Sequence, residues 1–260
     1  FCLPAIFLAL LRTPYVQQYI ANRLSEYLSE EMNTRVEIGK VDIIFPLDIS
    51  LRDVYIEDLH GKPLLTAKEI FVSPKHFNFG FSKLDFKKIR VDEAKMHLIH
   101  YPNEKDLNLQ FLIDYFSGSK KDTKPKESSP TSLQVEMIEL RKCSFFMQDL
   151  RKDLIAGNNI NFNNLLLSNI DLIGQNLFNN DSVTGIDLQH LALYEQSGFH
   201  LLHMSSQLSM TKNKIDAKML KLLTKNSNLN MDFSMRYDSM QAFNSFVDEV
   251  FLDAYFKNSK

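Results

Sequence analysis

Apolar and polar residues alternate along most of the chain after residue 34, as they do in half-buried β-strands. One spacing recurs in this region: apolar residues occupy the first, third, sixth and eighth positions of an eight-residue stretch, which we call an octad. Octads begin at Ile49, Ile89, Ile138 and Ile186, and a weaker one begins at Ile215. Their starts lie 40, 49, 48 and 29 residues apart, so we expect the chain to repeat one strand-containing unit.

The octad predicts a β-bulge in each copy. Side chains alternate between the two faces of a strand, so the step from the third to the sixth position places the two apolar pairs on opposite faces. One extra residue between the pairs returns all four side chains to the same face. Bulges that recur in successive units would bend the strands in one direction. The expected fold is therefore mainly β, an elongated, curved antiparallel sheet with one continuous apolar face.

Repeats of this length also occur in β-propellers and helical solenoids, but neither alternative fits the residues. The chain has no tryptophan, which the common propeller signature contains, and helical periodicity is confined to short segments. A sheet closed on itself would form a small ligand-holding barrel, whereas an open one would form a groove. The residues expected to line one apolar groove are Ile49, Leu51, Ile89, Val91, Met96, Ile138, Leu140, Phe145, Ile186, Leu188 and Leu193.

Such a groove predicts an apolar ligand, because a soluble protein rarely exposes a long apolar strip without a partner. The chain contains 20 phenylalanines and 10 methionines, which suit a surface for acyl chains and suit ordinary core packing equally well.

The chain opens with an uncharged run, FCLPAIFLALL. Eleven residues are too few to span a bilayer, which takes about 20 apolar residues in a helix. We expect residues 1–12 to be the end of a transmembrane helix; a signal-peptide core is the alternative. The expected anchor residues are Phe1, Leu3, Ile6, Phe7, Leu8, Leu10 and Leu11.

An amphipathic helix is expected over 13–33, with Thr13 as its N-cap and Pro14 in its first turn. Its apolar residues recur every four positions from Val16 to Leu28. We expect this stripe to close the end of the sheet; contact with a membrane surface is the alternative.

The rest of the chain divides into four segments. The first β-groove unit is expected over 34–116, with a short helix near 107–116 across the edge or mouth of the sheet. Residues 117–132 contain no apolar residue and four lysines, which predicts a flexible linker. The β-groove repeats continue over 133–238, and 239–260 is expected to be helical or to connect to further chain.

Composition and motifs point away from catalysis. A formal net charge of −2 gives no general field for nucleic acid, and two cysteines cannot form a disulfide framework or a zinc cluster. Two histidine pairs, His97 with His100 and His200 with His203, are spaced three residues apart and would point to opposite faces of a strand. No nucleophile elbow or phosphate-binding glycine loop occurs. We therefore expect no enzyme activity, no cofactor and no metal.

Several stretches resemble the N-terminal region of the TamB/AsmA-like proteins, particularly the long TamB-like proteins of Bacteroidetes. The stretches that carry the resemblance are 35–42, 45–56, 61–70, 109–113 and 193–199. The order of an apolar N-terminal run followed by an amphipathic helix is also similar. These motifs are structural, and the family has no catalytic residues to transfer to this chain.

The resemblance implies a single-pass protein of the bacterial inner membrane whose body lies in the periplasm as a β-taco, or repeating β-groove. It implies that the groove conducts phospholipid from the inner toward the outer membrane. The alternative is a periplasmic scaffold that assists assembly or secretion of outer-membrane β-barrel proteins with a barrel partner of the TamA type. In that case exposed strand edges would receive the strands of the client protein.

Overall fold

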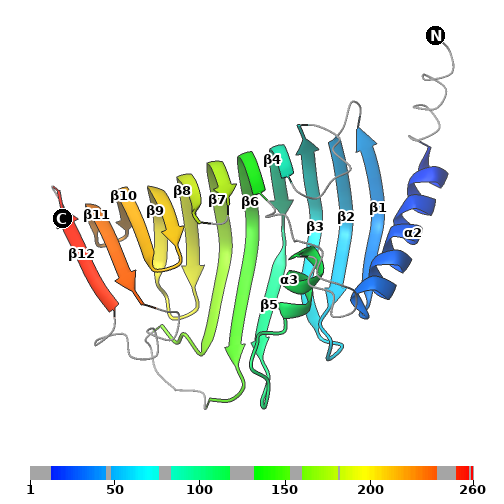
Figure 1. Ribbon diagram of the computed structural model, residues 1–260, viewed down its shortest axis with the longest axis horizontal. Helices are drawn as coiled ribbons and strands as arrows, with labels where there is room; N and C mark the ends of the chain where they lie inside the picture. The colour runs from blue at the N-terminus through cyan, green and yellow to red at the C-terminus, as the bar shows by residue number, and fades with distance from the viewer. Residues whose placement is uncertain are drawn as a thin grey trace, which may run out of the picture.

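The computed structural model describes residues 13–44, 48–75, 83–117, 132–152, 160–180, 182–238, 250–257 and 259 (Figure 1). The helices are α2 (Pro14–Met32) and α3 (Gln110–Ser117). The strands are β1 (Val36–Ile44), β2 (Asp48–Glu57), β3 (Pro63–Pro74), β4 (Lys83–Asp92), β5 (Lys95–His100), β6 (Ser132–Asp149), β7 (Asn164–Asn179), β8 (Thr184–Glu195), β9 (His200–Thr211), β10 (Lys214–Thr224), β11 (Asn228–Tyr237) and β12 (Val250–Phe256). The prediction of a mainly β fold is confirmed.

In this part of the chain, the twelve strands form one sheet in the order β1-β2-β3-β4-β6-β7-β8-β9-β10-β11-β12, and β5 pairs with β3 and β6. β4 and β5 together occupy one position in the sheet and are separated by a break at Glu93, whose φ is 50°. Both run parallel to β6, whereas all the other pairs are antiparallel. The expectation of a wholly antiparallel sheet is therefore wrong at β6, because the connection through α3 returns the chain to the end at which β4 begins.

The predicted bulges are present at the expected positions. The fifth residue of an octad has a left-handed φ at Asp53 (51°), Glu93 (50°), Lys142 (50°) and Met219 (51°). In the octad that begins at Ile186, the pairing with β9 shifts register directly after Leu188. A side chain at such a φ is disfavoured in regular strands, so these residues mark true irregularities of the sheet.

The octads of neighbouring strands lie in register. Ile89 of β4 pairs with Ile138 of β6, and Met96 of β5 pairs with Phe145 of the same strand. On the other side, Val72 of β3 pairs with both Ile49 and Ile89. The bulges at Asp53, Glu93 and Lys142 consequently lie in one line across β2 to β6, and the apolar residues of these strands form continuous rows on one face.

Helix α2 covers the β1 edge of the sheet. Ala21 of α2 is fully buried and packs in a cluster with Ile38 and Val41 of β1. The hydroxyl groups of Ser29 and Ser25 accept hydrogen bonds from the backbone N–H groups of Val36 and Ile38, each at 2.9 Å. The prediction that this helix closes one end of the sheet is confirmed, because the helix binds edge groups that an added strand would need.

Helix α3 lies across the apolar face near β5, as Figure 1 shows, and the expected helix near 107–116 is confirmed. Its Leu112 packs with Leu64 and Leu98, and Asn108, just before the helix, is bound to Asp58. The Asp58 carboxylate is 1% exposed and accepts hydrogen bonds from Asn108 Nδ2 and Tyr101 Oη, each at 2.9 Å. These bonds attach the loop before α3 to the β2–β3 turn.

Some predictions fall outside the described residues. The expected membrane anchor over 1–12 lies there, and so does the linker except for its ends, where α3 stops and β6 begins. The described helices include none whose length and apolar character would allow it to cross a membrane. For 239–260, which was expected to be helical or to connect to further chain, the helical alternative is wrong over Val250–Phe256, because these residues form β12 and pair with β11.

Candidate ligand-binding groove

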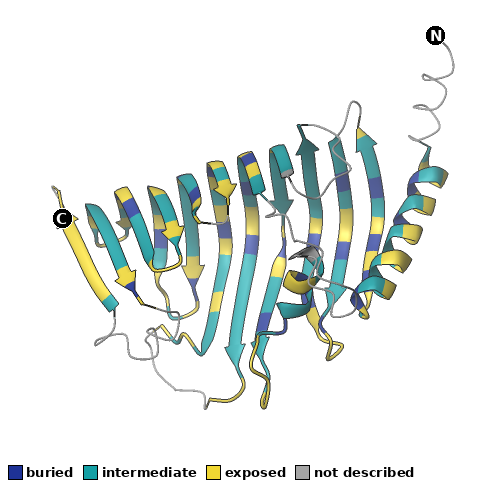
Figure 2. Ribbon diagram, in the orientation of Figure 1, coloured by how far each residue is buried: buried dark blue, intermediate teal, exposed yellow. Residues whose placement is uncertain are grey.

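The apolar face is built from the octad residues of six neighbouring positions in the sheet, from β2 to β8. Its central cluster contains the buried residues Val54, Ala67, Ala94, Cys143 and Ile170. Figure 2 shows buried positions recurring along β1 to β6, whereas β12 is exposed along nearly its whole length. Because each bulge turns the second apolar pair of an octad onto the same face as the first pair, all four apolar side chains contribute to one surface.

A hollow of about 470 Å³ lies on this face between β3 and β8. Its lining residues are Leu65, Val91, Ala94, Met96, Leu140, Cys143, Ser144, Phe145, Leu167, Ile170, Leu191 and Leu193. Every one except Ser144 has an apolar side chain, counting the cysteine thiol as apolar. Neighbouring strands lie ~4.8 Å apart, so the five strand positions that line the hollow extend over ~19 Å. An elongated apolar ligand fits this shape and chemistry.

Five of the predicted groove residues line the hollow. They are Val91, Met96, Leu140, Phe145 and Leu193.

The other predicted residues lie around the hollow rather than in it. Ile49 packs beneath α2, and Leu51 joins the α2 cluster to the central cluster. Ile138 and Ile186 fill the space over Gly174, where an added Cβ would lie 2.9 and 2.5 Å from their side chains. The positions of the remaining two residues, Ile89 and Leu188, follow from the residues with which they pair in the sheet.

Ile89 is half-buried and pairs with Val72 and Ile138, so it continues the apolar row beyond the hollow. Leu188 is 5% exposed and pairs with Gly174 and Ser206. The predicted set therefore lies on one surface region, of which the hollow is the open part and the rest is packed.

Sequence reasoning missed the contributions of β3 and β7. Leu65 begins an octad in β3, and another octad in β7 begins at Leu165 and includes Leu167 and Ile170. The β7 octad has its bulge at Asn169, where φ is 48°. The signal was present in both strands, because each shows the same spacing as the copies that were recognised.

Cys143 is a packing residue of the hollow. Burial raises the pKa of its thiol, and its Sγ lies 3.6 Å from the carbonyl oxygens of Val91 and Arg141. A thiol with a raised pKa is a poor nucleophile at neutral pH. The cysteine therefore adds apolar surface and no evident chemistry.

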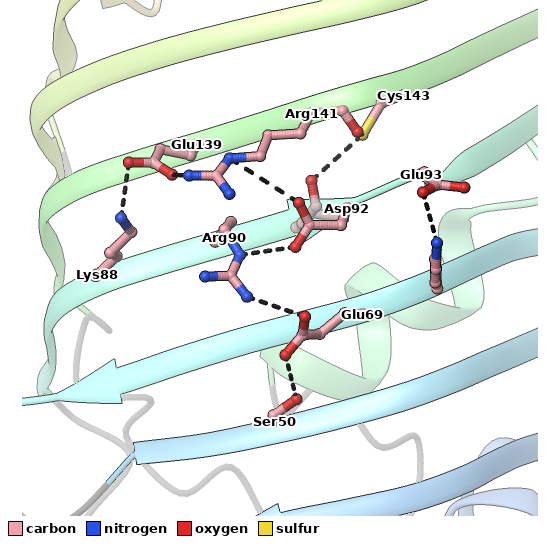
Figure 3. Close-up of polar contacts among 11 residues, drawn as sticks. Ser50, Glu69, Lys88, Arg90, Asp92, Glu93, Glu139, Arg141 and Cys143 are labelled. Carbon is pink, nitrogen blue, oxygen red and sulfur yellow. Dashed lines mark hydrogen bonds and ion pairs between the residues drawn. The ribbon is translucent and has the colours of Figure 1, made fainter. Parts of the chain in front are cut away.

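The opposite face of the sheet carries a network of charged side chains, which come from residues that alternate with the octad residues along the strands (Figure 3). Ser50 Oγ donates a hydrogen bond to Glu69 Oε1 at 2.6 Å, and Arg90 Nη2 lies 2.9 Å from Glu69 Oε2. Arg90 Nε lies 2.7 Å from Asp92 Oδ2. The Ser50 hydroxyl and the Arg90 charge hold the pKa of Glu69 below its ordinary value.

The network continues onto β6. Glu139 accepts Lys88 Nζ at 2.7 Å and Arg141 Nη2 at 2.6 Å. Burial would raise the pKa of Glu139, but the two cations outweigh burial, so its pKa lies below the ordinary value. The charged side chains of this network are thus paired with one another, whereas the other face has open apolar surface at the hollow.

The histidines that the structure describes do not form a chelating group. The His97 ring meets the edge of Phe146, and His100 Nε2 lies 3.1 Å from the Glu104 carbonyl oxygen. His203 Nδ1 lies 2.8 Å from His190 Nδ1, and burial together with the neighbouring imidazole lowers the pKa of His203. Among the described residues, no group of three or more His, Cys, Asp or Glu residues is arranged to hold a metal ion.

No protein-family model matches the chain, and no curated protein is significantly similar to it. The resemblance to TamB/AsmA-like proteins therefore stays a prediction from the quoted stretches.

Proposed function

We propose that this protein is a non-enzymatic carrier whose apolar groove binds the acyl chains of phospholipid. The hollow between β3 and β8 carries the proposal, because its lining is almost wholly apolar and its long dimension crosses several strands. Ligand sites are typically concave and mostly apolar. The charge network on the opposite face and the covered β1 edge leave the hollow as an open, concave apolar surface of this part of the sheet.

The direction of transport is part of the same proposal. The rows of octad residues run across the strands, so a lipid chain that moves along them meets one apolar contact after another. With the family resemblance, this favours a β-taco in the periplasm, anchored in the inner membrane, that passes phospholipid toward the outer membrane. Helix α2 would stand at the membrane end of that path.

The test is to place a charge in the hollow. Leu140→Asp puts a carboxylate against the acyl chain, and burial of an unpaired charge is strongly unfavourable. We expect phospholipid that copurifies with the protein, measured by extraction and mass spectrometry, to fall at least tenfold. Gln134→Asp is the matched control, since it adds the same charge to an exposed position of the same strand outside the hollow.

Leu193→Gln is a second, uncharged variant at the hollow and guards against misfolding of the first. Circular dichroism and the urea midpoint report whether each variant retains its sheet. If folded Leu140→Asp and Leu193→Gln proteins carry as much phospholipid as the Gln134→Asp control, the groove is not the binding site and the proposal is refuted.

The second candidate function is a scaffold for outer-membrane β-barrel assembly. It is favoured by β12, which pairs with β11 alone among the described strands and exposes Phe251, Leu252 and Tyr255 by 63, 50 and 68%. Such an edge suits strand addition. This function predicts copurification with a barrel protein of the TamA type, at a level that Leu140→Asp leaves unchanged.

A further inference from the structure

A second pocket lies beside α3, and we call it the α3 pocket. It has a volume of about 630 Å³ and is formed by the loop before α3, the helix itself and the ends of β5 and β6. Its lining residues are His100, Lys105, Asp106, Leu107, Leu109, Gln110, Ile113, Met147, Gln148, Asp149, Phe162 and Asn163. Unlike the hollow, it mixes apolar walls with charged and amide side chains.

The α3 pocket and the hollow share an apolar wall. Phe145 of β6 lines the hollow, and Met147, two residues further along the same face, lines the α3 pocket. Two residues of a strand span ~7 Å. Leu107 and Leu109 of the α3 pocket also pack in one cluster with Phe145 and Met147. A molecule with an apolar part and a polar part could therefore occupy both sites.

The charges of the α3 pocket are of both signs. Lys105 and Asp106 are exposed, and neither makes a hydrogen bond or ion pair with another described residue. Asp149, by contrast, is held by Arg151 at 2.8 Å, which lowers the pKa of that carboxyl. The pocket thus offers one unpaired ammonium and one unpaired carboxylate on adjacent residues. Their charges sum to zero.

We infer that the α3 pocket binds the headgroup of the phospholipid whose acyl chain lies in the hollow, and that it favours a zwitterionic headgroup with a phosphate and a primary ammonium. The inference rests on the proposed function. Lys105 would attract the phosphate, and Asp106 would accept hydrogen bonds from the ammonium group. An anionic headgroup without an amine would meet the same lysine but would be repelled by Asp106.

The experiment compares two lipids with identical fluorescent acyl chains, a phosphatidylethanolamine and a phosphatidylglycerol, for binding to the full chain. We expect the wild-type protein to bind the ethanolamine lipid more tightly. Asp106→Asn should shrink that preference roughly two- to fivefold, the effect of one partly exposed charge. Lys105→Gln should weaken both lipids by a similar factor. Asp238→Asn, an exposed residue that does not line the α3 pocket, is the matched control.

The outcomes separate this inference from the function on which it rests. If Asp106→Asn leaves the lipid preference unchanged while the protein still binds both lipids in the hollow, the headgroup assignment alone is overturned. If Leu140→Asp leaves the binding of both lipids unchanged, the groove itself is overturned as the binding site. A wild-type preference for the glycerol lipid also overturns the inference, because it requires a net positive pocket.

Discussion

The line of bulges predicts an unusual response to glycine in the middle of a strand. Lys142 is the bulge residue of β6, with φ at 50°, and its side chain is exposed. Its backbone N–H donates to Asp171 Oδ1 at 2.9 Å, and this bond persists whatever side chain stands at the position. Substitutions at Lys142 therefore report mainly on the backbone conformation.

The expected magnitudes follow from the left-handed φ. A residue with a Cβ is disfavoured there by about 1–2 kcal/mol, and glycine avoids this strain. Glycine also lowers the free energy of unfolding by about 0.5–1 kcal/mol, because its greater conformational freedom stabilises the unfolded chain. We expect Lys142→Gly to raise the free energy of unfolding by roughly 0.5 kcal/mol on balance. Lys142→Val should lower it by about 1 kcal/mol or more, because a β-branched residue resists positive φ more strongly.

Gln134 provides the control within the same strand. It is exposed, lies in β6 between paired strands and has no positive φ. There we expect the opposite order, with Gln134→Gly destabilising by about 0.5–1 kcal/mol and Gln134→Val close to neutral. Urea unfolding followed by circular dichroism measures all four variants. If glycine destabilises position 142 as much as position 134, the bulge does not hold the left-handed conformation and the reasoning fails.

Two further predictions concern the helices. Ser29→Ala removes the acceptor for the Val36 N–H, so we expect the free energy of unfolding to fall by about 1 kcal/mol. Amide exchange should become faster along β1. Exchange in β6 should not change, and β6 is therefore the internal control. Burial alone would raise the pKa of Asp58, but bonds from Asn108, Tyr101 and backbone N–H groups outweigh it and the pKa lies below its ordinary value. The resulting stabilisation of the α3 loop should be present above about pH 4 and lost as the pH falls further. Asn108→Ala should remove about 1.5–3 kcal/mol of this stabilisation at pH 7, as measured by amide exchange in the loop. If amide exchange in the Asn108→Ala loop keeps the pH dependence of the wild-type loop, the prediction is contradicted.

The bulges could be predicted from the sequence because they follow from local spacing. Two apolar pairs in one octad can share a face only if one residue between them is extra, whatever the neighbouring strands do. The same argument located the irregularity at Lys142 and at Met219, 77 residues further on. The β7 octad, with its bulge at Asn169, obeys it as well. The amphipathic helix before β1 was predictable for a similar reason, since its stripe and its Thr13-Pro14 start are local signals.

The pairing of the strands could not be read from spacing. An octad specifies which side chains share a face but not which strand lies beside it or in which direction. The parallel pairing of β6 with β4 depends on the path of the chain through α3. The bond between Asp58 and Asn108 joins residues 50 positions apart, and neither has a distinctive neighbourhood in the sequence.

The sequence by itself determined that this protein is mainly β, that several strands carry bulges and that the apolar residues of an octad share one face, since periodicity and side-chain alternation are properties of a single segment. Only the tertiary structure decided which strands lie side by side, that β4 and β5 run parallel to β6, and that the bulges of β2, β4 and β6 align. It also decided that a hollow stays open between β3 and β8 beside a pocket with charges of both signs. These features depend on register between strands and on contacts between distant segments, which no single segment specifies.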